Sequence, residues 1–86
     1  MHELSLAMEI CRMAEDHLGR EALPSLVEVG VEVGDDSGIE PENLEFCLEA
    51  LLKEPPFTGA RPKIIRLPGD VLRLNYLEVD DGRPDH

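Results

Sequence analysis

The stretch that decides the fold is Ser25–Gly34, SLVEVGVEVG, in which valine occupies every second position from Val27 onward. Alternation with a period of two is typical of a β-strand, because successive side chains point to opposite faces of a sheet. The pattern therefore predicts a strand that is covered on one face only. The covered face would carry Val27, Val29, Val31 and Val33, and the other would carry Leu26, Glu28, Gly30 and Glu32.

Two helical patterns flank this strand. Apolar residues between positions 4 and 18 recur at steps of three and four, the spacing of one helix face, and Gly19 is placed to end that helix. The stripe consists of Leu4, Ala7, Met8, Cys11, Ala14 and Leu18, broadened by Leu6, Ile10 and Met13. After a turn-rich break, Pro41 suits the first position of a second helix, about 41–53. Its apolar stripe is Leu44, Cys47, Leu48, Leu51 and Leu52, with Glu42, Glu45 and Glu49 towards solvent.

The carboxyl-terminal third supplies two further strands, PKIIRL at 62–67 and VLRLNYLEV at 71–79. The short linker of Pro68, Gly69 and Asp70 favours an antiparallel hairpin between them. In the last strand the apolar residues change phase, and a bulge around Asn75 and Tyr76 would restore a common face. We therefore expect an α+β domain over residues 1–80, in the order α-β-α-β-β. Its two amphipathic helices would pack on one face of a three-stranded sheet, and 81–86 would form a flexible tail.

Composition restricts the function. Nineteen acidic residues against eight basic ones give a formal charge of −11, which disfavours nucleic acid and anionic membrane surfaces as partners. Such a charge fits a metal cation or a basic protein surface, and equally a solubilising coat. No apolar run is long enough to cross a bilayer, and the first residues lack the basic start of a secretory signal. These features make the cytoplasm the expected location.

The cysteines and most histidines carry no recognisable site. Cys11 and Cys47 are far apart in sequence and each lies within a helical stripe, so we interpret both as core thiols rather than as zinc ligands. His17 lies one residue before the end of the apolar stripe of the first helix. There its side chain can interact favourably with the negative end of the helix dipole. With histidine only at positions 2, 17 and 86, and no nucleophile paired with a base, the sequence does not indicate an enzyme.

The first three residues form a candidate chelate. The α-amine of Met1, the backbone nitrogen and imidazole of His2, and the backbone nitrogen of Glu3 can approach one ion together. Four nitrogen donors in a plane suit Ni(II) or Cu(II) rather than tetrahedral Zn(II). In the alternative interpretation, His2 and Glu3 come after the initiator methionine by chance. The negative charge of Glu3 then only stabilises the positive, amino-terminal end of the helix.

Three stretches, MHELSLAMEI at the start, VEVGVEVGDDSGIEPENLEFCLEALL in the middle and VLRLNYLEV near the end, resemble the HypA/HybF family of nickel metallochaperones. The resemblance implies the same element order and Ni(II) ligands at Met1, His2 and Glu3, with the Glu3 carboxylate as a ligand or as a group that orients a partner. It also implies delivery of Ni(II) to a [NiFe]-hydrogenase large subunit, with a HypB-type GTPase as a possible partner.

The sequence departs from the family pattern at one point. Family members carry a zinc lobe with two CxxC pairs between the last two strands, whereas IIRLPGDVLRL runs directly through this region, so no zinc is expected. A metal-independent hydrogenase assembly module, which recognises its partner through Glu42, Glu45 and Glu49, is the alternative function.

Overall fold

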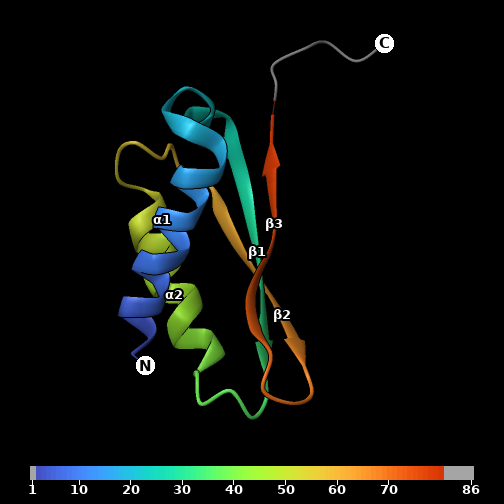
Figure 1. Cartoon of the computed structure of the whole chain (residues 1–86). Coiled ribbons are helices and arrows are strands. Elements are labelled where there is room, and N and C mark those ends of the chain that lie inside the picture. The colour runs from blue at the N-terminus through green and yellow to red at the C-terminus, as the bar shows by residue number, and fades with distance from the viewer. Residues whose placement is uncertain (1, 81–86) are drawn as a thin grey trace.

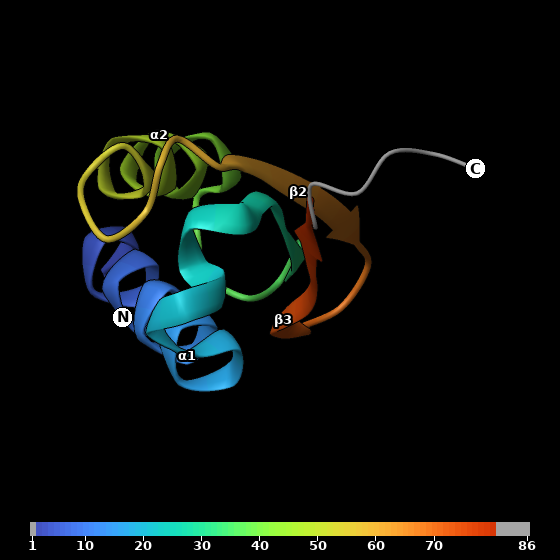
Figure 2. The ribbon, with the colours of Figure 1, turned by 90° about the horizontal axis from the view of Figure 1, so that it is seen from above.

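The computed structural model describes residues 2–80, and Met1 and the tail at 81–86 lie outside this range. Two helices cover one face of a three-stranded sheet (Figures 1 and 2), which confirms the predicted α+β class and element order. No helix within the described range is both long and apolar enough to cross a membrane. In chain order the elements are α1 (Glu3–Ala22), a 3-10 turn (Leu23–Ser25), β1 (Leu26–Gly34), α2 (Pro41–Leu52), β2 (Arg61–Leu67) and β3 (Leu72–Val79).

The predicted hairpin between the last two strands is wrong. The strand order is β2-β1-β3, with β1 parallel to β2 and antiparallel to β3, so the valine-rich strand separates the other two. Because β1 lies between them, β2 and β3 are two strand spacings apart, roughly 10 Å. The four residues Pro68–Val71 can span about 13 Å when extended, which is enough to connect them. A short linker therefore connects two strands that are not neighbours, and this is why its length alone was misleading.

The linker between β2 and β3 crosses the end of β1 and is held there by backbone hydrogen bonds. The N–H of Gly34 donates to the carbonyl of Val71 at 2.6 Å, and the N–H of Asp36 donates to the carbonyl of Gly69 at 2.7 Å. A Cβ atom at Gly34 would lie 2.2 Å from the Gly69 carbonyl oxygen. Only glycine fits at this position, because the crossing chain occupies the space of a side chain.

The core lies between the sheet and the helices. On β1, Val29, Val31 and Val33 are fully buried, as predicted for the valine face. Leu26 was assigned to the opposite face, yet it is buried in the core, whereas Val27 is only half-buried. The pairing of β1 with β3 shifts between Leu26 and Glu28, and this irregularity changes the phase of the first residue of the strand.

The predicted bulge in β3 is confirmed. Gly30 pairs with Tyr76 and the next residue, Val31, pairs with Leu74, so Asn75 is the extra residue. With the phase restored, the leucines on both sides of the bulge pack against the core; these are Leu72, Leu74 and Leu77.

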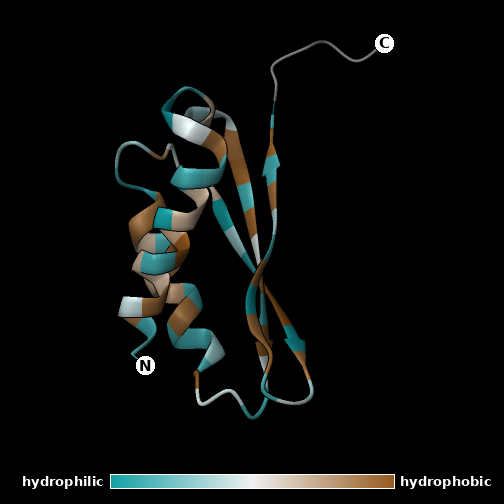
Figure 3. Cartoon of the chain, in the orientation of Figure 1, coloured by the Kyte–Doolittle hydropathy of each residue, from teal (hydrophilic) through white to brown (hydrophobic). Residues whose placement is uncertain are grey.

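The helices bury leucine-rich faces, although not every predicted residue belongs to them. In α2, Leu44, Leu48 and Leu52 are fully buried, as the stripe predicted. In α1 the buried face is Leu6, Ala7, Ile10 and Ala14, whereas Leu4 and Met8 are 52% and 57% exposed. The predicted stripe of α1 is thus wider than the surface that α2 and the sheet offer, and the side chains at its edge remain in solvent. Hydrophobic and hydrophilic segments alternate along both helices (Figure 3). Gly19 interrupts α1 with a positive φ of 78°, as predicted, but one more turn follows it.

Candidate metal-binding site

His2 stands immediately before α1 with an extended backbone, φ −80° and ψ 146°. Its carbonyl accepts the first helical hydrogen bond, from the N–H of Leu6 at 3.0 Å. Its side chain is exposed and makes no capping hydrogen bond. The imidazole is therefore accessible to an ion, while the carbonyl is committed to the helix. Met1, the other main donor of the predicted chelate, lies outside the described residues.

The carboxylate of Glu3 is directed to the start of α2. Its Oε2 accepts a hydrogen bond from the backbone N–H of Glu40 at 3.0 Å, and its Oε1 accepts one from Nδ2 of Asn43 at 3.2 Å. These contacts, first the Glu40 N–H, then the N–H of Glu3 itself and then Asn43, lower the pKa of Glu3 below its ordinary value. Glu40, which precedes α2, makes no side-chain cap of its own, and Glu3 on another helix accepts the backbone N–H of Glu40, one of the free donors at the start of α2.

These contacts point to neither of the two roles left open for the Glu3 carboxylate, a metal ligand or a group that orients a partner. Both carboxylate oxygens bind the start of α2, so in this structure the side chain links the first turns of the two helices. The backbone N–H of Glu3 belongs to the first turn of α1, whose amides have no helical acceptor. In this structure that N–H also donates a hydrogen bond to the carboxylate of Glu3 itself.

Side chains alone do not assemble a metal site in the described part of the chain. Among residues 2–80 there is no group of three or more histidine, cysteine or acidic side chains that could hold an ion. His17 is exposed, and it lies 15 residues along α1 from His2, about 22 Å at the rise of a helix. A site at the amino terminus therefore depends on main-chain nitrogens, the donors that suit square-planar Ni(II).

The cysteines are free thiols that pack against the core, which agrees with their interpretation as core residues. Burial raises the pKa of Cys11 to about 11. At neutral pH Cys11 is protonated and is a poor metal ligand, because metals bind the thiolate.

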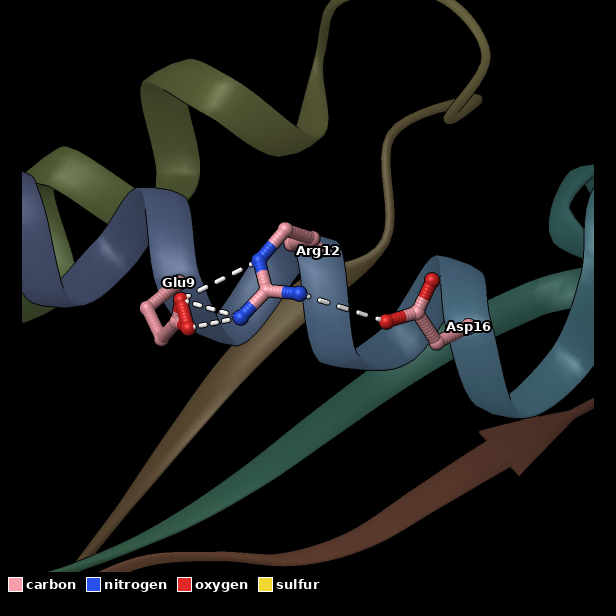
Figure 4. A network of polar contacts seen from close by, with 3 residues as sticks. All are labelled: Glu9, Arg12 and Asp16. Carbon is pink, nitrogen blue, oxygen red and sulfur yellow. Dashed lines mark hydrogen bonds and ion pairs between the residues drawn. The ribbon is translucent and has the colours of Figure 1, made fainter.

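Two carboxylates on the outer side of α1 are also engaged. Arg12 donates from Nη2 to Glu9 Oε2 at 2.7 Å and lies 3.5 Å from the carboxylate of Asp16 through Nη1 (Figure 4). The hydrogen bonds from Arg12 lower the pKa of Glu9. Exposed pairs of this kind add little to stability. Their effect here is to neutralise part of the negative charge along α1.

The three glutamates predicted to bind a partner form a row on α2, away from the chelate. Glu45 and Glu49 line a shallow depression with Arg61, and Glu42 and Glu45 line another with Lys63 and Arg66. Asn43, by contrast, reaches towards α1. The row therefore faces the β2 side of α2, and the structure does not bring it together with His2.

Asn43 and the backbone of Glu40 are the site residues that sequence reasoning missed. Both lie in the middle stretch that resembles the family, VEVGVEVGDDSGIEPENLEFCLEALL, in which neither residue was given a role in the metal site. One signal was available: the helix that begins at Pro41 follows a glutamate, a poor capping residue, so a cap from elsewhere in the chain was to be expected.

Comparison with known proteins shows the family to which the chain belongs. A family model described as hydrogenase/urease nickel incorporation, metallochaperone, hypA matches residues 1–72, which include the tripeptide, Glu40 and Asn43. The chain belongs to the HypA family. Hydrogenase maturation factor HypA of Albidiferax ferrireducens is 38% identical to it over 69 residues, which cover 80% of this chain and 61% of the relative. HypA of Dechloromonas aromatica is 39% identical over 69 residues, which again cover 80% of this chain and 61% of the relative.

A longer match extends towards the end of the chain. HypA of Paracoccus denitrificans is 30% identical over 84 residues, 94% of this chain and 74% of that relative. The chain spans about three fifths of the length of the first two HypA relatives. The family model covers α1, β1, α2 and β2, and the Paracoccus denitrificans match extends further along the chain.

Proposed function

We propose that this chain binds Ni(II) at its amino terminus and delivers it to the large subunit of a [NiFe]-hydrogenase, without catalytic turnover. The observation that carries the proposal is the geometry of Glu3. Its carboxylate is held by Glu40 and Asn43, and this holds the backbone of Glu3, next to the exposed His2, at the start of α1. The match to a nickel-incorporation family over residues 1–72 supports the choice of metal.

In this proposal the ligands are the amine of Met1, the backbone nitrogen and imidazole of His2, and the backbone nitrogen of Glu3. Each backbone nitrogen releases its proton when it binds the ion, so binding strengthens as the pH rises. Release then follows by ligand exchange, in which groups on the acceptor replace these nitrogens one at a time. The exposed imidazole of His2 is the donor that an acceptor displaces most easily.

The proposal does not include a zinc lobe. Residues 68–71 connect β2 to β3 directly, and the only cysteines, Cys11 and Cys47, lie on helices within the core layer. We propose that nickel binding and delivery require no zinc here. Metal analysis of protein purified without chelator tests this point: stoichiometric zinc would contradict it.

A second candidate function follows from the row of Glu42, Glu45 and Glu49. Because the row lies on the β2 side of α2, a partner could bind it without contact with the chelate. The chain would then act as a metal-independent hydrogenase assembly module, with the large subunit or a HypB-type GTPase as partner. A complex that survives both chelator and His2→Ala would favour this function over nickel delivery.

The decisive experiment is a titration with Ni(II) of protein that begins at Met1 with a free amine. We expect His2→Ala to abolish tight binding, and a form with added amino-terminal residues to behave like His2→Ala. His17→Ala is the matched control, because this histidine is exposed on the same helix but far from the terminus. Equal nickel affinity in wild type and His2→Ala would contradict the proposed function.

A further inference from the structure

The connection from the end of β1 to the start of α2 is held by hydrogen bonds along most of its length. We call this connection, residues 34–40, the strap. Every backbone N–H from Gly34 to Ser37 donates a hydrogen bond to a backbone carbonyl, at distances of 2.6–3.0 Å. A connection whose backbone groups are paired in this way follows one defined path, unlike a loop whose backbone groups bind only water.

The first half of the strap is bound to the linker that connects β2 to β3. Its N–H groups at positions 34, 35 and 36 donate to carbonyls at the end of β2 and in the linker, those of Val71, Leu67 and Gly69 respectively. The N–H of Ser37 then donates back to the carbonyl of Gly34 at 3.0 Å, which closes a turn. The position of the linker therefore determines where the strap begins.

The second half of the strap ends at the residue that binds Glu3. The N–H of Ile39 donates to Oγ of Ser37 at 3.2 Å, and the side chain of Ile39 is buried in the core. The next N–H, that of Glu40, donates to the Glu3 carboxylate at 3.0 Å. Because successive peptide planes share a Cα atom, the direction of the Glu40 N–H depends on the path that the strap takes through Ser37.

These contacts form a continuous series from the linker to the first turn of α1. The linker, the strap and the starts of both helices lie at the same end of the molecule (Figure 1). Glu3 in turn is next to His2, the exposed residue of the candidate chelate. A displacement of the linker is therefore passed along bonded groups to the backbone beside the candidate site.

We propose that the strap is a positioning element of the nickel site, through which the β2–β3 linker controls the affinity for Ni(II). This inference rests on the proposed function. The affinity is highest when the linker holds the strap, because the Glu40 N–H is then directed to Glu3. Coupling between two sites is reciprocal, so bound nickel in turn stabilises the contacts of the linker. Pro68, Gly69 and Asp70 are exposed, so a protein that contacts the linker would change nickel affinity without touching a ligand.

Ser37→Ala tests the middle of the strap, because it removes the acceptor of the Ile39 N–H. We expect the Ni(II) affinity, measured by isothermal titration, to fall about tenfold. Exchange of the Glu40 amide with deuterium, measured by NMR without nickel, should become about tenfold faster. Thr58→Ala is the matched control, since the Thr58 hydroxyl also makes one hydrogen bond to the backbone, to the carbonyl of Pro24 at 3.0 Å, outside the strap. Both quantities should stay within about twofold of the wild type in this control.

Gly69→Ala tests the linker. The φ of Gly69 is +87°, where a side chain strains the backbone, and among the described residues only its chain neighbours lie within 4 Å of an added Cβ atom. Gly59 has a φ of +95° and the same open surroundings, but its N–H donates to Leu52 at the other end of α2. We expect both substitutions to lower the unfolding midpoint similarly. Only Gly69→Ala should weaken nickel binding, about tenfold, and speed exchange of the Glu40 amide.

Wild-type nickel affinity in either strap variant, or an equal loss in a variant and its control, would overturn the inference. So would exchange of the Glu40 amide at the wild-type rate in both variants. If Gly69→Ala does not fold, Ser37→Ala decides alone. His2→Ala keeps the two proposals apart: wild-type nickel affinity in His2→Ala would refute the proposed function, whereas exchange of the Glu40 amide tests the strap without nickel.

Discussion

The side-chain amide of Asn43 donates a hydrogen bond of 3.2 Å to the carboxylate of Glu3, 40 residues earlier in the chain. Together with the N–H of Glu40, it ties the first turn of α1 to the first turn of α2. The residue next to the candidate metal ligand His2 is thus fixed by a different helix. Nickel affinity and the start of α2 should therefore depend on each other.

The first prediction concerns Asn43. Replacement by alanine removes one of the two groups that hold Glu3, so the backbone nitrogens of the tripeptide should be less well positioned. Loss of a group that orients metal ligands typically costs tenfold or more in affinity, and we expect nickel binding to weaken about tenfold. Isothermal titration with Ni(II) measures it. Asn75→Ala is the matched control, because that amide binds Glu32 on β1 and not the helices; an equal loss in both variants would contradict a specific role for Asn43.

The second prediction concerns the pH dependence of folding. The hydrogen bonds from Glu40 and Asn43 lower the pKa of Glu3 below 4.5 in the folded protein. The folded state therefore favours the charged carboxylate, so this contribution to stability is present above pH 4.5 and is lost as the pH falls through the folded pKa. We expect Glu3→Gln to show a smaller decrease of the unfolding midpoint between pH 5 and pH 3 than the wild type. Urea unfolding at several pH values tests this, and parallel curves for the two proteins would contradict it.

The third prediction tests which side of α1 and α2 is buried. Leu48 is fully buried, so Leu48→Ala should lower the free energy of unfolding by about 2–5 kcal/mol. Leu4 is mostly exposed, so Leu4→Ala should change it by less than about 0.5 kcal/mol. Chemical denaturation of both variants is sufficient. Similar losses would mean that Leu4 belongs to the core, as the apolar stripe had predicted.

The fourth prediction concerns the crossing of the β2–β3 linker over β1. A methyl group at Gly34 would collide with the carbonyl of Gly69, so Gly34→Ala should destabilise the protein by about 1–3 kcal/mol, as overpacking does. Asp36→Ala serves as the control, because it keeps the backbone hydrogen bond to Gly69 and removes only an exposed side chain. If Gly34→Ala unfolded at the wild-type midpoint, the linker would not pass where the structure has it.

Periodicity predicted the elements well and their arrangement less well. The valine alternation located β1, and the phase change at Asn75 located a bulge, because both are local properties of the chain. The neighbours of β1 were not predicted correctly, since the length of a linker does not say whether a third strand lies between its ends. The exposure of Leu4 and Met8 was missed for a similar reason: it depends on how much surface the rest of the fold offers.

Nickel binding by Met1, His2 and Glu3 stays a prediction. The His2 side chain precedes the first helical turn and is exposed. The cap that Glu3 provides for α2 could not be read from its own neighbourhood, since its partners are at positions 40 and 43. Contacts between residues far apart in sequence come from packing, and no local pattern records them.

The central position of β1 leaves both β2 and β3 as edge strands, and an exposed edge can pair with another chain and start aggregation. The two edges carry different protection. β2 bears Arg61, Lys63 and Arg66, together with Pro62, which has no N–H to donate. β3 is interrupted by its bulge at Asn75. Both edges of this small sheet are thus protected against pairing with another chain.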